Sequence, residues 1–73
     1  MPINYKEVGS RIRYRRTGML LTQAQLAERI DRSITFVGHI ERGTRKMSLE
    51  TLLAISEALN ISTDYILKDN PSR

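Results

Sequence analysis

Apolar side chains recur at helical spacing along most of the chain, in five short segments separated by turns of a few residues. The segments run over residues 5–17, 22–30, 33–42, 48–59 and, last, a short stretch that ends at residue 67. No stretch of useful length alternates with period two, which argues against β-strands. Because each apolar stripe is narrow, every helix must bury its stripe against the others. The pattern predicts an all-α fold, a compact five-helix bundle forming one domain over residues 5–67.

Capping residues indicate where these helices begin and end. Thr22 is followed three residues later by Gln25, which is the pattern of a capping box. Ser33 and Ser48 each precede an apolar segment and are good N-caps. Gly43 follows the third segment, where a helix commonly stops.

Only Asp31 and Arg32 join the second and third helices. So short a connection forces the two helices to cross at a steep angle, which is the helix-turn-helix arrangement. Such a turn usually needs one residue with positive φ. We expect it at Asp31, because Asp tolerates that region better than most residues other than glycine.

A helical wheel divides the third helix into an apolar side and a small polar side. Around Val37, at the centre of the buried face, the wheel places Ile34, Ile40 and Glu41. The opposite side carries Thr35 and His39, with Gly38 and Arg42 beside them. A solvated helix face usually carries Lys and Glu, whereas this short outer face suits close approach to another surface. Glycine in mid-helix costs about 1 kcal/mol relative to alanine. Gly38 therefore reflects either tolerated sequence drift or a partner that comes close to the backbone.

Glu41 lies on the buried side of the third helix, where an isolated charge would be costly. On the first helix, Arg16 follows Ile12 by four residues and so lies on the same core-facing side. We predict a largely buried, structural Arg16–Glu41 ion pair that fixes the first helix against the third. The alternative is that both side chains extend to water.

Composition narrows the class of protein. With 73 residues the chain is too short for a two-domain enzyme, and without Cys it is neither a disulfide-stapled scaffold nor a Cys-ligated zinc finger. It has no 18-residue apolar stretch and no signal pattern at its start, so we expect a cytoplasmic location and no membrane partner. Residues 68–73, which include Asn70-Pro71, are expected to form a flexible C-terminal tail.

The charge is unevenly distributed along the chain. Residues 1–46 hold ten cations against four acids, a net of +6, whereas residues 47–73 hold two cations against four acids, a net of −2. Such asymmetry indicates nucleic acid or an acidic membrane surface as a partner. A solubilising surface with no partner would give the same pattern.

An enzyme is not expected. The chain has one His, no Cys and no glycine-rich phosphate loop, and Asp31 near His39 is a weak pair without a pocket. No further metal ligands cluster in the sequence with His39. We therefore expect no cofactor and no small-molecule ligand.

Several motifs occur in order along the chain. They are Arg11-Ile12-Arg13-x-x-Arg16, Leu21-Thr22-Gln23-x-x-Leu26-Ala27, Ile40-Glu41-Arg42-Gly43 and Ser48-Leu49-Glu50-Thr51-Leu52. Each alone is weak, but in this order and spacing they resemble the Cro/C1-type helix-turn-helix family of bacterial and phage repressors. The resemblance covers about residues 5–67. It implies a five-helix, lambda-repressor-like bundle that binds double-stranded operator DNA, usually as a homodimer.

The resemblance also implies roles for single residues. The helix over residues 33–42 would enter the major groove, and its base-facing positions would be Ile34, Thr35, Gly38 and His39. Thr35 could bond a base, Ile34 could touch a thymine methyl, and His39 could donate to guanine N7 or O6, unless it is a surface histidine with no role. Positions near the DNA backbone would be Arg13, Thr22, Gln23, Ser33, Phe36, Arg42, Thr44, Arg45 and Lys46, with Arg15 a looser candidate.

Three positions depart from the family pattern. Leu20 stands where the family often has glycine, so the turn after the first helix is expected to differ. Arg32 replaces a small apolar residue and must reach water or a phosphate. Neither Ile34 nor Thr35 gives bidentate base readout, so specificity is expected to be modest or to depend on DNA shape.

The expected function is therefore a sequence-specific DNA-binding transcriptional regulator, a repressor by resemblance. The alternative is a protein-interaction module of the same fold, similar to an antitoxin or antirepressor. Its mark would be an exposed apolar patch formed by Tyr14, Met19, Leu20, Tyr65 and Leu67. Those residues could equally form a homodimer contact or part of the core.

Overall fold

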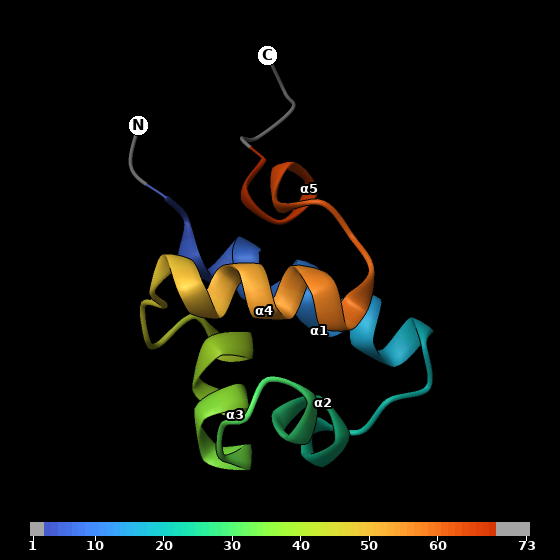
Figure 1. Cartoon of the computed structure of the whole chain (residues 1–73). Coiled ribbons are helices and arrows are strands. Elements are labelled where there is room, and N and C mark those ends of the chain that lie inside the picture. The colour runs from blue at the N-terminus through green and yellow to red at the C-terminus, as the bar shows by residue number, and fades with distance from the viewer. Residues whose placement is uncertain (1–2, 69–73) are drawn as a thin grey trace.

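Five helices follow one another along the part of the chain that the computed structural model describes, residues 3–68 (Figure 1). They are α1 (Tyr5–Gly18), α2 (Gln23–Arg29), α3 (Ile34–Arg42), α4 (Leu49–Leu59) and α5 (Thr63–Leu67). The described residues contain no strand. The predicted all-α fold with five helices is confirmed, and residues 69–73 of the predicted tail lie outside the described residues.

Each helix begins directly after a polar residue whose side chain accepts a hydrogen bond from the backbone three residues on. These N-caps are Asn4, Thr22, Ser33, Ser48 and Ser62. At Thr22 the reciprocal bond is also present, from the Thr22 backbone N–H to Gln25 Oε1 at 2.8 Å, so the predicted capping box is confirmed. The helices start one residue later than their caps because the cap residues keep extended dihedrals.

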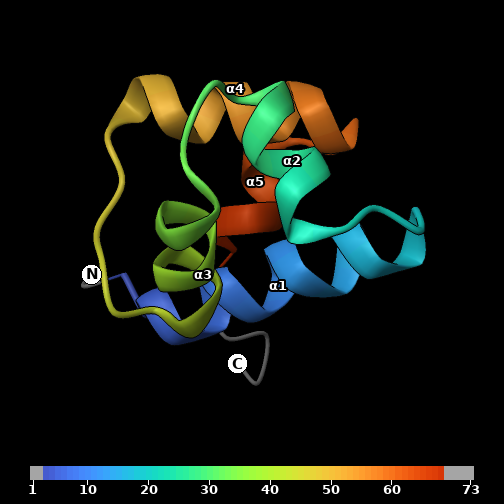
Figure 2. The same cartoon turned by 90° about the horizontal axis from the view of Figure 1, so that it is seen from below.

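The helices enclose a single core. α4 crosses in front of α1, with α5 on one side, while α2 and α3 lie side by side on the other (Figures 1 and 2). All five helices contribute buried apolar side chains, among them Val8, Ile12, Leu26, Val37, Ile40, Ile55, Leu59 and Ile66. The pair α2 and α3 is thus held against α1 and α4, and this leaves the far sides of α2 and α3 open.

Gly9 brings α1 into direct backbone contact with α3. A Cβ atom at this position would lie 2.3 Å from the carbonyl oxygen of Ile40 and 2.5 Å from that of Glu41. Real side chains do not tolerate such distances to backbone atoms, so the two helices can approach this closely only over glycine. Gly9, which the sequence did not single out, therefore sets how near α3 lies to the core.

The turns depend on left-handed residues. Asp31 has a φ of 58°, which confirms the predicted helix-turn-helix geometry. Leu20 has a φ of 62°, the conformation that glycine favours, so this leucine carries some backbone strain in the turn after α1. Gly43 ends α3 with a φ of 76° and packs against the backbone of Lys6.

The residues expected in an apolar patch divide into two groups. Met19 and Tyr65 pack against the core, whereas Tyr14, Leu20 and Leu67 are exposed. None of the helices within residues 3–68 has the length and apolar character that crossing a membrane requires.

Candidate nucleic-acid interface

α3 presents a mixed outer surface. Thr35 and Arg42 are exposed and His39 is half-buried, while Val37 and Ile40 are in the core, as the wheel predicts. Ile34 differs, because 52 % of its surface is exposed. It is the first residue of the helix and projects past the edge of the core. Its placement on the buried side was wrong, and its predicted place on the outer surface fits the structure.

The predicted Arg16–Glu41 ion pair is confirmed. Arg16 donates from Nε to Glu41 Oε2 at 2.6 Å and from Nη2 to Oε1 at 3.0 Å, and the Glu41 side chain is only 2 % exposed. Arg16 Nη1 also donates to the carbonyl oxygen of Leu21 at 2.7 Å. A bidentate pair in which all three guanidinium nitrogens donate fixes both orientation and distance, so α1 holds α3 through this contact.

Two side chains predicted to face the DNA backbone are engaged inside the protein. The Gln23 amide donates to Glu41 Oε1 at 3.0 Å, which adds the start of α2 to the ion-pair network. The Thr22 hydroxyl oxygen accepts from the backbone of Gln25 in the capping box. Thr22 thus caps α2, and Gln23 ties the first turn of α2 to α3.

Some of the basic charge counted in the sequence is used to bind the chain's own carbonyl oxygens. Arg15, the looser phosphate candidate, donates from Nε to Leu59 O at 2.9 Å, at the end of α4. Arg11 donates to Ile66 O at 3.1 Å. These two arginines join α1 to α4 and α5, because a cation is favourable beside the unpaired carbonyls of a helix end. The net charge of the first 46 residues therefore overstates what is available to a partner.

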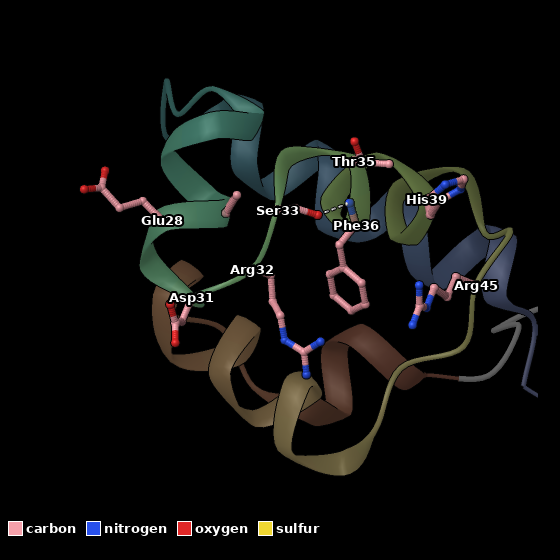
Figure 3. A pocket seen from close by; sticks show the side chains of 9 residues that line it. Glu28, Asp31, Arg32, Ser33, Thr35, Phe36, His39 and Arg45 are labelled. Carbon is pink, nitrogen blue, oxygen red and sulfur yellow. Dashed lines mark hydrogen bonds between the residues drawn. The ribbon is translucent and has the colours of Figure 1, made fainter.

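The Phe36 ring lies between the side chains of two arginines. Only 8 % of this residue's surface is exposed and it belongs to the core, while its edge lines the hollow beside α3; its place near the DNA backbone stays a prediction. The guanidinium carbon of Arg32 lies 4.7 Å from the ring centroid and that of Arg45 lies 5.2 Å from it, on either side of the ring (Figure 3). Arg32 also donates to Thr51 Oγ1 at 3.2 Å. Arg32 thus contacts α4 and Phe36 and is also exposed, in agreement with the prediction that it reaches water.

His39, Arg42 and Thr44 form a cluster at the end of α3. His39 Nδ1 lies 3.0 Å from Thr44 Oγ1 and 3.5 Å from Arg42 Nη2. The Arg42 guanidinium also covers Gly38, since a Cβ there would lie 3.1 Å from Arg42 Nη1. Gly38 is therefore buried, and its predicted base-facing position is covered by an arginine that could move aside.

Hollows on both sides of α3 bring the remaining candidates together. One hollow is lined by Ser33, Thr35, His39 and Arg45 among others (Figure 3). On the other flank, Arg13, Gln23 and Arg42 line a second hollow beside the ion pair. Lys46 is exposed in the loop that follows. Among residues 3–68, no three His, Asp or Glu side chains gather as a metal site would require.

Comparison with known proteins identifies the family to which this helix-turn-helix belongs. The model of the family described as "Helix-turn-helix" matches residues 12–66, which is most of the chain. The chain belongs to the Cro/C1-type helix-turn-helix family. The resemblance seen in the sequence is therefore confirmed, and so is the lambda-repressor-like bundle.

Relatives within the Cro/C1-type family include regulators and phage repressors. An uncharacterised transcriptional regulator of Rhodospirillum rubrum is 40 % identical over 62 residues, covering 85 % of this chain and 57 % of that protein. Repressor protein C2 of Salmonella phage P22 is 37 % identical over 71 residues, covering 97 % of this chain and 33 % of the repressor. The chain thus spans between a third and about three fifths of these relatives.

A solved structure of a Cro/C1-type protein shows the same arrangement. The P22 c2 repressor crystallised with a synthetic operator is 38 % identical to this chain. The match covers 86 % of this chain and 96 % of the crystallised one, with a TM-score of 0.81. The crystallised repressor and this chain therefore share one fold over most of their residues.

Proposed function

We propose that this protein is a DNA-binding transcriptional regulator, acting as a repressor, that inserts α3 into the major groove of double-stranded operator DNA. The observation that carries the proposal is the surface of α3. Thr35, Ile34 and His39 form its outer side, within a fold shared with a repressor crystallised on an operator. A helix of nine residues with one exposed side is the kind of element that fits the major groove.

Cations on both flanks of α3 support the proposal. Arg13 and Arg42 lie on one side, and Arg45 and Lys46 lie on the other side and in the following loop. Contacts to phosphates give affinity and orientation, whereas contacts to base edges give specificity. We assign the flanking cations to the phosphates, and Ile34, Thr35 and His39 to the bases.

The salt dependence of binding tests this assignment. Fluorescence anisotropy of a labelled mixed-sequence duplex should show an affinity that falls steeply as salt rises, because bound cations release counterions from DNA. Lys46→Gln should reduce the slope of log K against log salt by about 1. Lys68→Gln is the matched control and should leave the slope unchanged, because Lys68 is the C-cap of α5 and α5 lies on the other side of α4 from α3 (Figure 1). Binding that is insensitive to salt would refute the proposal.

We also propose that the regulator acts as a homodimer in the cytoplasm. Proteins of this architecture read two half-sites about one helical turn apart through twofold symmetry. Leu49 and Leu53 lie one turn apart on α4 and are 70 % and 50 % exposed, an apolar surface that pairing would cover. Sedimentation equilibrium of the wild type and of Leu53→Glu tests this. A wild type that stays monomeric on operator-length DNA would refute it.

A further inference from the structure

We propose that a groove lined by α1 and α3 binds consecutive phosphates of one DNA strand, and that Lys6 and Ser10 of α1 contact this strand. The inference rests on the proposed function of α3, whose assigned phosphate contacts on this flank are Arg13 and Arg42. It adds α1 as a second DNA-binding element, which follows the backbone while α3 reads the bases.

The groove is made of two hollows that join. The hollow beside the buried ion pair continues into a second one, with which it shares Arg13, Glu41 and Arg42. The other lining residues, from the start of α1 to the start of α2, are Lys6, Glu7, Ser10, Arg16, Gln23 and Thr44. Figure 2, which looks onto α2 and α3, shows α1 running along one edge of this pair. A duplex that meets α3 therefore also comes close to α1.

One face of α1 carries the groove's polar residues. Lys6, Ser10 and Arg13 follow one another at spacings of four and three residues, which puts them on one side of the helix, and all three are exposed. The adjoining side of α1 contacts α3 through Gly9, against the backbone, and through Arg16, in the ion pair. The polar face therefore borders α3 directly and stays open to a partner.

The start of α1 is held beside the end of α3. A Cβ atom on Gly43 would lie 2.5 Å from Lys6 Cα and 2.7 Å from the Lys6 backbone nitrogen, so the two backbones meet here with no side chain between them. Together with the contact at Gly9, this fixes the first turns of α1 against α3. Because the backbone of the groove is already ordered, binding pays little of the entropy that a mobile arm would lose.

The charges of the groove suit a row of phosphates. Both of its carboxylates, Glu7 and Glu41, already have an arginine partner, at 3.2 Å and 2.6 Å. The three cations Lys6, Arg13 and Arg42 form no ion pair with any of residues 3–68. A DNA strand carries one negative charge per nucleotide at regular intervals. The groove therefore offers several cations to one strand, while its acids are neutralised by the protein itself.

The salt dependence of binding measures the contact of Lys6. In the anisotropy titration, Lys6→Gln should reduce the slope of log K against log salt by about 1, because one fewer counterion is released. Lys68→Gln, the same chemical change at the end of α5, should leave the slope unchanged. Ser10→Lys adds a cation to the groove, so it should tighten binding and raise the slope by about 1. Asp64→Asn raises the net charge equally but on α5, and it should do neither.

Ser10→Ala tests the hydroxyl of Ser10, which can donate a hydrogen bond to a phosphate oxygen. A neutral donor releases no counterion, so the affinity should fall by about fivefold, the effect of one hydrogen bond, while the salt slope stays at the wild-type value. Alanine favours the helix more than serine does, so weaker binding would not come from a loss of α1. An unchanged affinity would overturn the assignment of Ser10.

Ethylation interference, on a duplex of the sequence that the wild type selects, locates the contacts. Ethyl groups on consecutive phosphates of one strand should block the wild type, and Lys6→Gln should lose this sensitivity at one end of the row. An identical pattern or an unchanged salt slope in Lys6→Gln would overturn the role of α1. If Lys46→Gln still reduced the slope in that case, the DNA-binding function would stand without α1. A wild type that is insensitive to salt would overturn both.

Discussion

Replacing Arg16 by methionine removes the cation from a network that ties three helices together. The Glu41 carboxylate accepts from Arg16 Nε at 2.6 Å, from Arg16 Nη2 at 3.0 Å and from Gln23 Nε2 at 3.0 Å. In Arg16→Met the Glu41 carboxylate keeps only the donor from Gln23, although the Glu41 side chain is only 2 % exposed. It also leaves the carbonyl of Leu21 without its 2.7 Å donor.

The expected loss is large relative to the stability of so small a domain. Breaking a buried ion pair by removing one partner costs about 3–5 kcal/mol, because an unpaired charge stays buried. A domain of 73 residues has a free energy of unfolding of about 4–11 kcal/mol, from typical values per residue. Arg16→Met should therefore remove between about a quarter and all of the stability.

A double-mutant cycle isolates the pair. Arg16→Met combined with Glu41→Leu removes both charges, so no carboxylate is left buried and uncompensated. The double variant should be more stable than the sum of the single changes predicts, by about 2–3 kcal/mol of coupling. Urea unfolding followed by far-ultraviolet circular dichroism suits a helical chain without tryptophan. A loss below about 1 kcal/mol for Arg16→Met, the value of an exposed pair, would show that the reasoning is wrong.

Three glycine-related changes give further predictions. Gly9→Ala places a Cβ 2.3 Å from Ile40 O, so urea unfolding should show a net loss of at least about 2 kcal/mol despite better helix propensity. Leu20→Gly removes left-handed strain from a side chain that is 89 % exposed, so thermal unfolding should show a gain of about 0.5 kcal/mol. Gly38→Ala displaces only the mobile end of Arg42, so chemical unfolding should show a gain of up to about 1 kcal/mol, while anisotropy should show weaker DNA binding.

Each of these three predictions would be contradicted by a specific result. A Gly9→Ala variant as stable as the wild type would mean that α1 and α3 can separate at little cost. A loss of stability in Leu20→Gly would mean that the leucine side chain contributes a contact. Unchanged DNA affinity in Gly38→Ala would mean that no partner approaches the backbone of α3 there.

Much of the fold could be predicted because its determinants are local. The caps at Thr22, Ser33 and Ser48 act on backbone groups three residues away, so spacing alone identifies them. The positive φ of Asp31 follows from the length of one turn. The Arg16–Glu41 pair was the one long-range contact that the sequence predicted, because a charge on a buried helix face requires a partner.

The sequence could not predict the contacts of side chains that have a choice of partners. Arg15 reaches a carbonyl 44 residues away in the chain, and no local pattern distinguishes it from a phosphate-binding arginine. The motif places Phe36 near the DNA backbone, but it does not show that the ring is buried between Arg32 and Arg45. Gly9 matters only once the approach of α1 to α3 is known. In each case the missing information was the relative placement of two helices.

The central claim is that α3 reads DNA. Its most direct test is a comparison of the sequences that the wild type and the double variant Thr35→Ala, His39→Ala select from a randomised duplex library. Both residues lie on the outer side of α3 and neither belongs to the core, so the variant should fold. The account predicts that the double variant still binds duplex DNA through its flanking cations but loses the preferred bases that the wild type selects. Recovery of the same preferred sequence by both proteins would contradict it.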